Sequence, residues 1–88
     1  MTIEAYVLFK VSSGTERESC EKIAELDEVS MVGIVYGEYD VIARISVPDM
    51  KELEKFVGEK IRKIESLLVT STMIIAREYV GKNKRIAK

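Results

Sequence analysis

The first part of the chain alternates between two kinds of side chain. Positions 3, 5, 7, 9 and 11 are all apolar, and the positions between them are more mixed. A period of two is the pattern of a β-strand, and similar runs rich in β-branched residues recur further along. We therefore predict four strands, over residues 3–11, 29–36, 41–47 and 67–80.

Two segments between these strands have apolar residues three and four positions apart, the spacing of an amphipathic helix. The first is predicted over residues 16–26, where Thr15 and Glu18 match a capping box. The second is predicted over residues 50–64, and Asp49 with Glu52 gives a similar start. Gly58 within it costs about 1 kcal/mol relative to alanine, so the helix either approaches a neighbour closely there or kinks.

The resulting order, βαββαβ, predicts an α+β fold of the ferredoxin-like sandwich type. Right-handed crossovers place both helices on one face of a four-stranded antiparallel sheet. The strands stay apolar on both faces, as Leu8 beside Phe9 and Ile42 beside Ala43 illustrate. A sheet face in contact with water should be more polar, so we expect a subunit partner to cover it and the chain to form a homo-oligomer.

Composition narrows the functional classes. The 88 residues suggest one domain over residues 1–80, followed by a basic tail over residues 81–88 that is either a solvated terminus or a nucleic-acid contact. The formal net charge of -1 offers no field for DNA, and direct DNA binding is not expected. The chain has no histidine and a single cysteine, so we expect no metal, no cofactor, no catalytic residues and no enzymatic activity. Without a signal peptide or membrane span, it is expected to be cytoplasmic.

Several short motifs occur in a distinctive order over residues 3–79. They are Val11 with Gly14, Val29, the turn Tyr36-Gly37-Glu38-Tyr39-Asp40, Asp49 with Leu53 and Phe56, and Val69-Thr70-Ser71-Thr72. In this order they resemble the RAM (regulation of amino acid metabolism) domain, the effector-binding half of Lrp/AsnC transcription regulators.

The resemblance implies dimers that assemble into larger rings, octamers or decamers, with a small amino acid as effector at a subunit interface. Regulators of this family also carry an N-terminal helix-turn-helix, which this chain, starting at its first strand, is expected to lack. We therefore expect an amino-acid-sensing, oligomerising regulatory domain. The alternatives are a ligand-independent module that pairs with full-length Lrp/AsnC regulators and, less favoured, a small ferredoxin-like enzyme.

The family places its effector against the turn, which nominates Tyr36, Gly37, Tyr39 and Asp40 as ligand-binding residues. Asp40 could accept the ammonium group of the amino acid. The alternative is that Gly37 supplies only turn geometry and Asp40 only a local hydrogen bond or charge pair.

Strand alternation adds Thr70 and Thr72, whose hydroxyls point to one face while Ser71 points to the other. Threonine is also an ordinary strand residue. The ligand is expected where the turn over residues 37–40 meets this strand of a neighbouring subunit.

Overall fold

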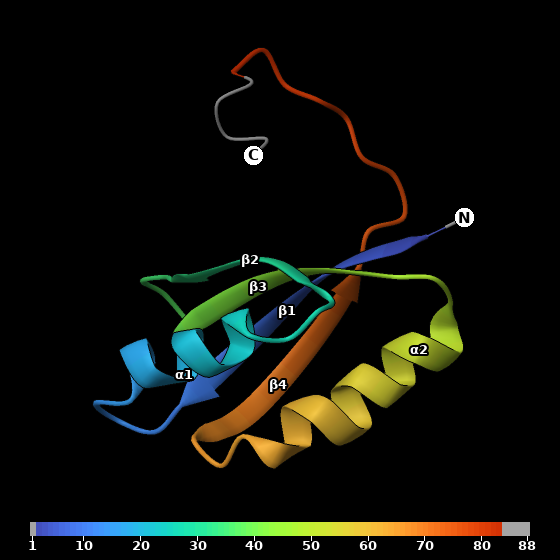
Figure 1. Ribbon diagram of the computed structural model, residues 1–88. Helices are drawn as coiled ribbons and strands as arrows, with labels where there is room; N and C mark the ends of the chain where they lie inside the picture. The colour runs from blue at the N-terminus through green and yellow to red at the C-terminus, as the bar shows by residue number, and fades with distance from the viewer. Residues whose placement is uncertain (1, 84–88) are drawn as a thin grey trace.

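The computed structural model describes residues 2–83, which form four strands and two helical segments (Figure 1). Their order is β1 (Ile3–Val11), α1 (Glu16–Ala24), β2 (Val29–Ile34), β3 (Val41–Val47), α2 (Met50–Lys55), η1 (Phe56–Lys60), η2 (Ile61–Lys63) and β4 (Leu67–Ile74).

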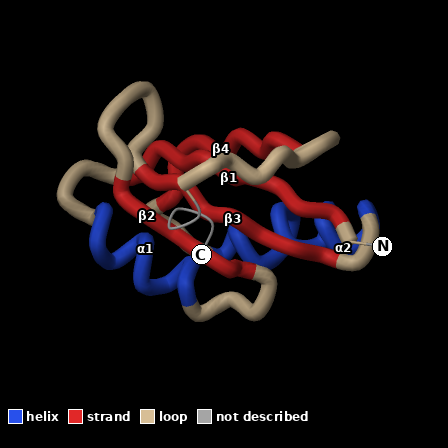
Figure 2. Tube along the Cα trace, turned by 90° about the horizontal axis from the view of Figure 1, so that it is seen from above, coloured by secondary structure: helices blue, strands red, loops and turns tan. Residues whose placement is uncertain are grey.

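The four strands form one antiparallel sheet in the order β2-β3-β1-β4. In the register of the central strand, Val7 lies opposite Ala43 of β3 on one side and Thr72 of β4 on the other. Figure 1 shows both helical segments beneath the sheet, and Figure 2, seen from above, shows the sheet lying over them. The predicted ferredoxin-like α+β class is therefore confirmed.

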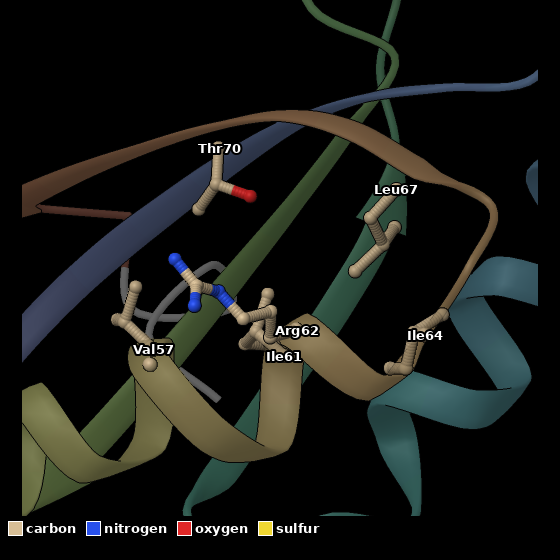
Figure 3. A pocket seen from close by; sticks show the side chains of 7 residues that line it. Val57, Ile61, Arg62, Ile64, Leu67 and Thr70 are labelled. Atoms are coloured by element: carbon tan, nitrogen blue, oxygen red, sulfur yellow. The ribbon is translucent and has the colours of Figure 1, made fainter.

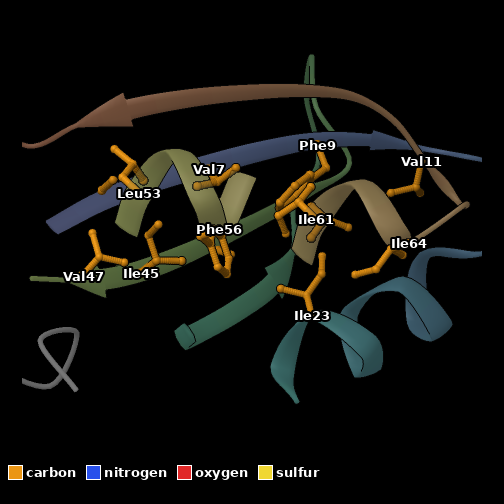
Figure 4. Packing of buried hydrophobic residues seen from close by; sticks show 13 residues of the cluster. Val7, Phe9, Val11, Ile23, Ile45, Val47, Leu53, Phe56, Ile61 and Ile64 are labelled. Carbon is orange, nitrogen blue, oxygen red and sulfur yellow. The ribbon is translucent and has the colours of Figure 1, made fainter. Parts of the chain in front are cut away.

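The hydrophobic core lies between the sheet and the helices (Figure 4). The largest fully buried side chains include Phe9 of β1, Ile23 of α1 and Phe56 of η1, so every layer contributes. All four odd-numbered positions of β3 are buried, as alternation predicts for a strand with one face toward the core. Among residues 2–83, no helix lies on the opposite face of the sheet, which we call the uncovered face.

The first helix begins at Glu16 as predicted, but its end and its cap differ from the prediction. It ends at Ala24 rather than Leu26, because the amides of Glu25 and Leu26 bond to carbonyls three residues back and tighten the last turn. The predicted Thr15 cap is wrong. The Thr15 hydroxyl instead donates to the Ser12 carbonyl at 2.6 Å, and its backbone is not in the extended conformation that an N-cap needs.

The second helical segment begins as predicted, since the Asp49 carboxylate accepts a bond from the Glu52 amide at 2.9 Å. It is not one regular helix, however. After α2 the chain widens into the π-helical turn η1 and then tightens into the 3₁₀ turn η2. Gly58 lies within the π turn, and a Cβ there would meet no atom within 4 Å. The glycine therefore accompanies a change of helical pitch rather than a close approach to a neighbour.

Two strands are shorter than predicted. β2 ends at Ile34 instead of residue 36, because the Val35 amide bonds to the Asp40 carbonyl and closes the turn. β4 ends at Ile74 instead of residue 80. The Ile75 amide still bonds to the Glu4 carbonyl, but β1 begins at Ile3 and offers nothing further to pair with. Residues 75–83 rise from the sheet on the side away from the helices (Figure 1). The rest of the predicted basic tail, residues 84–88, lies outside the described part of the chain.

Candidate functional site

The turn between β2 and β3 is attached to the central strand through Asp40. Its backbone amide donates to the Phe9 carbonyl at 2.9 Å, and its carboxylate Oδ2 accepts a bond from the Val11 amide at 3.0 Å. These contacts give Asp40 the local structural role that the sequence left open. Among residues 2–83, Oδ1 accepts no hydrogen bond.

The other predicted turn residues are arranged around a glycine-dependent bend. Gly37 has a φ of 155°, a backbone conformation that L side chains rarely adopt, so this position needs glycine. Tyr36 is fully exposed. The ring of Tyr39 lies under the Lys10 ammonium, 5.9 Å from the ring centroid. The turn thus presents aromatic and backbone groups at one end of the sheet.

The two predicted threonines lie on the helix side of β4. Thr70 pairs with Phe9 and Thr72 with Val7, both core residues, whereas Ser71 pairs with Leu8 of the uncovered face. The prediction that the two hydroxyls share a face is therefore confirmed. Neither hydroxyl has a hydrogen-bond partner within the described part of the chain.

Beside Thr70 lies a cavity of about 290 Å³ between β4 and the end of the second helical segment (Figure 3). Four apolar side chains, one glycine, one arginine and one threonine line it, namely Val57, Ile61, Ile64, Leu67, Gly58, Arg62 and Thr70. We call this cavity the β4 groove. Figure 3 shows the guanidinium of Arg62 between Val57 and Thr70.

Of the six predicted ligand-binding residues, only Thr70 lines the β4 groove. Asp40 and Thr70 each contact Phe9 of β1 through backbone bonds or pairing, so they flank the same strand without sharing this cavity. Sequence reasoning missed Arg62. In the sequence it is one basic residue among several on an amphipathic helix, and only its place in the cavity between η2 and β4 distinguishes it.

The uncovered face of the sheet holds a second, larger cavity of about 750 Å³ between the strands and residues 78–83. At its centre Arg44 bonds to Glu78 at 2.7 Å, to Glu4 at 3.4 Å and to the Tyr6 hydroxyl at 3.1 Å. The bonds to Glu78 and Tyr6 raise the pKa of Arg44, so its charge is permanent. Several apolar side chains on this face stay largely exposed, among them Met31, Val69 and Met73.

Three other ionisable groups, none of which lines either cavity, have shifted pKa values. Burial disfavours the charged form of Glu28, but the hydrogen bond and charge of Lys60 at 2.6 Å outweigh it and lower the Glu28 pKa. The pKa of Lys60 is raised by the same bond. Burial raises the pKa of the Cys20 thiol, which packs against the core and is therefore a poor nucleophile.

The described residues contain no helix long and apolar enough to cross a membrane. Within the same residues, no three of the cysteine, aspartate and glutamate side chains gather closely enough to hold a metal ion.

The architecture defines a small ferredoxin-like α+β domain with an apolar uncovered face and a groove beside its last strand. The model of the Lrp/AsnC ligand binding domain matches residues 4–84. The chain therefore belongs to the Lrp/AsnC family of transcription regulators.

Individual relatives agree with this assignment. An uncharacterized HTH-type transcriptional regulator of Pyrococcus furiosus is 38% identical over 73 residues, which cover 83% of this chain and 49% of that protein. The leucine-responsive regulatory protein of Salmonella typhimurium is 26% identical over 66 residues, covering 75% of this chain and 40% of that protein. The chain thus spans about half the length of the curated relatives it matches.

The crystal structure of FFRP-DM1 is similar over nearly its whole length. It is 41% identical, with a TM-score of 0.80, and the match covers 83% of this chain and 97% of that one.

Proposed function

We propose that this chain is an amino-acid-sensing domain that self-associates and binds a small amino acid between subunits. The observation that carries the proposal is the unpartnered Thr70 hydroxyl beside the apolar β4 groove, in a chain of the Lrp/AsnC ligand-binding family. The name of the leucine-responsive relative supports an amino acid as effector.

The ligand chemistry follows from the need to satisfy both charges of an amino acid. The hydroxyls of Thr70 and Thr72 are available to its carboxylate, and the free Oδ1 of Asp40 from a neighbouring copy is available to its ammonium. Tyr36, Gly37 and Tyr39 would then border the ligand on the turn side.

Self-association is supported by the uncovered face of the sheet. Large apolar side chains such as Val69 and Met73 are about half exposed there, which is unfavourable unless a second copy covers them. A ligand that binds only the assembled form would stabilise it by about 2.7 kcal/mol at a hundred times its dissociation constant. Assembly and amino-acid concentration would thereby be coupled.

A calorimetric titration of the full chain with the twenty amino acids, paired with solution mass by ultracentrifugation, tests the proposal. Thr70→Val removes one hydroxyl with little change of shape and should weaken binding by about ten- to hundredfold, the range for a single hydrogen bond to a charged group such as the ligand carboxylate. Ser71→Ala is the matched control, because it removes a hydroxyl from the opposite face of the same strand. Absence of heat with every amino acid, and a mass that none of them changes, would contradict the proposal.

A second candidate function is pairing with longer regulators of the same family. It is favoured by the 38% identity to an HTH-type regulator about twice as long as the matched region. Mixing this chain with such a regulator and separating the species by native mass spectrometry should give mixed oligomers. Recovery of each protein only with itself would count against pairing.

A further inference from the structure

We infer that Arg62 is the carboxylate-binding residue of the β4 groove and that the groove selects short aliphatic carboxylates. This inference rests on the proposed function, because it assigns a ligand class and a specificity-determining residue to the same region.

The floor of the groove is apolar and rigidly held. Ile61 and Ile64 are 3% and 9% exposed, so their positions are fixed by the core, and Val57 and Leu67 pack against the same core. A cavity of about 290 Å³ lies at the small end of the range for ligand pockets. Such a floor favours a branched or short aliphatic group over a charged or long one.

The rim of the groove carries one positive charge. Arg62 makes no hydrogen bond or ion pair within residues 2–83, and no aspartate or glutamate lines the cavity. A planar guanidinium can bind a carboxylate through two parallel hydrogen bonds. The unpartnered Thr70 hydroxyl across the cavity can donate a third.

The helical segment is irregular at this place. The π turn η1 and the 3₁₀ turn η2 both contribute lining residues, and Gly58 of the π turn leaves open space where another residue would have a side chain. π turns are uncommon and occur often at functional sites, because they displace a helix locally. Here the pitch change coincides with the part of the segment that lines the groove.

The guanidinium of Arg62, the Thr70 hydroxyl and the apolar floor can bind the carboxylate and the side chain of an amino acid but not its ammonium group. Among residues 2–83, the groove offers an ammonium group only backbone and hydroxyl oxygens, whereas the guanidinium requires an anion. A 2-oxo acid that shares the aliphatic chain and the carboxylate should therefore bind through Arg62 as well. An amide of the same amino acid, which has no carboxylate, should not.

The test compares three related probes by calorimetry on the full chain: L-leucine, 4-methyl-2-oxopentanoate and L-leucinamide. We expect both acids to bind the wild-type chain and the amide to bind at least about tenfold more weakly, as for loss of one charge-assisted hydrogen bond. Arg62→Gln should weaken the binding of both acids to a similar extent. Lys63→Gln is the matched control, since it removes the same charge from the next residue, which is exposed and does not line the groove.

Arg62→Lys separates charge from geometry, because lysine keeps the charge but loses the planar pair of donors. It should retain part of the affinity that Arg62→Gln loses. Arg62 has no partner to lose among the described residues, so these variants should melt at the wild-type temperature.

The outcomes distinguish this inference from the proposed function. Leucine binding that Arg62→Gln leaves unchanged would overturn the role of Arg62 and leave amino-acid sensing intact. Arg62-dependent binding of the oxo acid without binding of leucine would support the role of Arg62 and overturn amino-acid sensing. Equal affinity for leucine and leucinamide, or no binding of any probe, would overturn the inference.

Discussion

Asp40 has two roles that can be tested separately, a hydrogen bond that holds the turn and the proposed contact with the ligand. Its Oδ2 accepts the Val11 amide at 3.0 Å, and Val11 itself is only 7% exposed. Asp40→Ala removes the acceptor and leaves that amide without a partner. A hydrogen bond to a charged group is worth about 1.5–3 kcal/mol, and the part-buried setting places the expected loss in the free energy of unfolding at about 1–2 kcal/mol.

For a domain of this size a loss of 1 kcal/mol lowers the melting temperature by about 4–8 °C. Asp40→Ala should therefore melt several degrees below wild type. Asp40→Asn keeps an oxygen that can accept the same bond, so it should lose less than about 1 kcal/mol. Urea and thermal unfolding, followed by circular dichroism, measure both variants at the protein concentration used for wild type, so that concentration adds no difference between them.

Glu38→Ala is the control, because it removes an exposed carboxylate from the same turn and should change stability by no more than about 0.5 kcal/mol. The reasoning is refuted if Asp40→Ala is as stable as Glu38→Ala. The asparagine variant then tests the ligand separately. If it folds like wild type yet loses amino-acid binding, the charge of Asp40 acts on the ligand rather than on the turn.

Three further predictions concern other parts of the molecule. Gly58→Ala should raise the free energy of unfolding by about 0.5–1 kcal/mol in urea titrations, since a Cβ there meets no atom; a loss of stability would contradict this. Met73→Glu, on the uncovered face, should lower the solution mass in ultracentrifugation, whereas Lys51→Glu on the helix side should not; equal masses would count against association through that face. The lowered Glu28 pKa stabilises the fold above the ordinary glutamate pKa of about 4.3, and this contribution is lost as the pH falls further. Lys60→Gln should therefore reduce the loss of melting temperature between neutral and acid pH. The same pH dependence in this variant and in wild type would contradict the prediction.

Features with a strong local signal were predictable from the sequence. The strands Ile3–Val11 and Val41–Val47 were predicted to the residue, because alternation toward one core defines where pairing is favourable. The Asp49 cap was also predicted correctly, since an aspartate directly before a helix readily accepts a hydrogen bond from an amide of the first turn. The Thr15 cap was wrong because the Thr15 backbone is not extended, so its hydroxyl oxygen accepts no bond from an amide of the first turn and donates to the Ser12 carbonyl.

Features set by distant contacts were not predictable. The end of β4 depends on where β1 begins, and the bond from Val11 to Asp40 joins residues 29 positions apart. The π turn likewise has no local signature beyond Gly58. At the site, the face of Thr70 and Thr72 followed from alternation. The groove and the place of Arg62 in it depend on how far η2 lies from β4 in the folded chain, which the sequence does not show.

The two surfaces proposed for binding lie on opposite sides of the sheet. The apolar face with Met73 is uncovered, whereas the β4 groove with Thr70 opens on the helix side. A second copy seated on the uncovered face would therefore not touch a ligand in the groove. For the turn of a neighbouring copy to reach that ligand, a second contact is needed, of a different kind from the face-to-face one. Two distinct contacts per subunit are what build assemblies larger than a dimer, and ligand binding would then act on the second contact and leave the first unchanged.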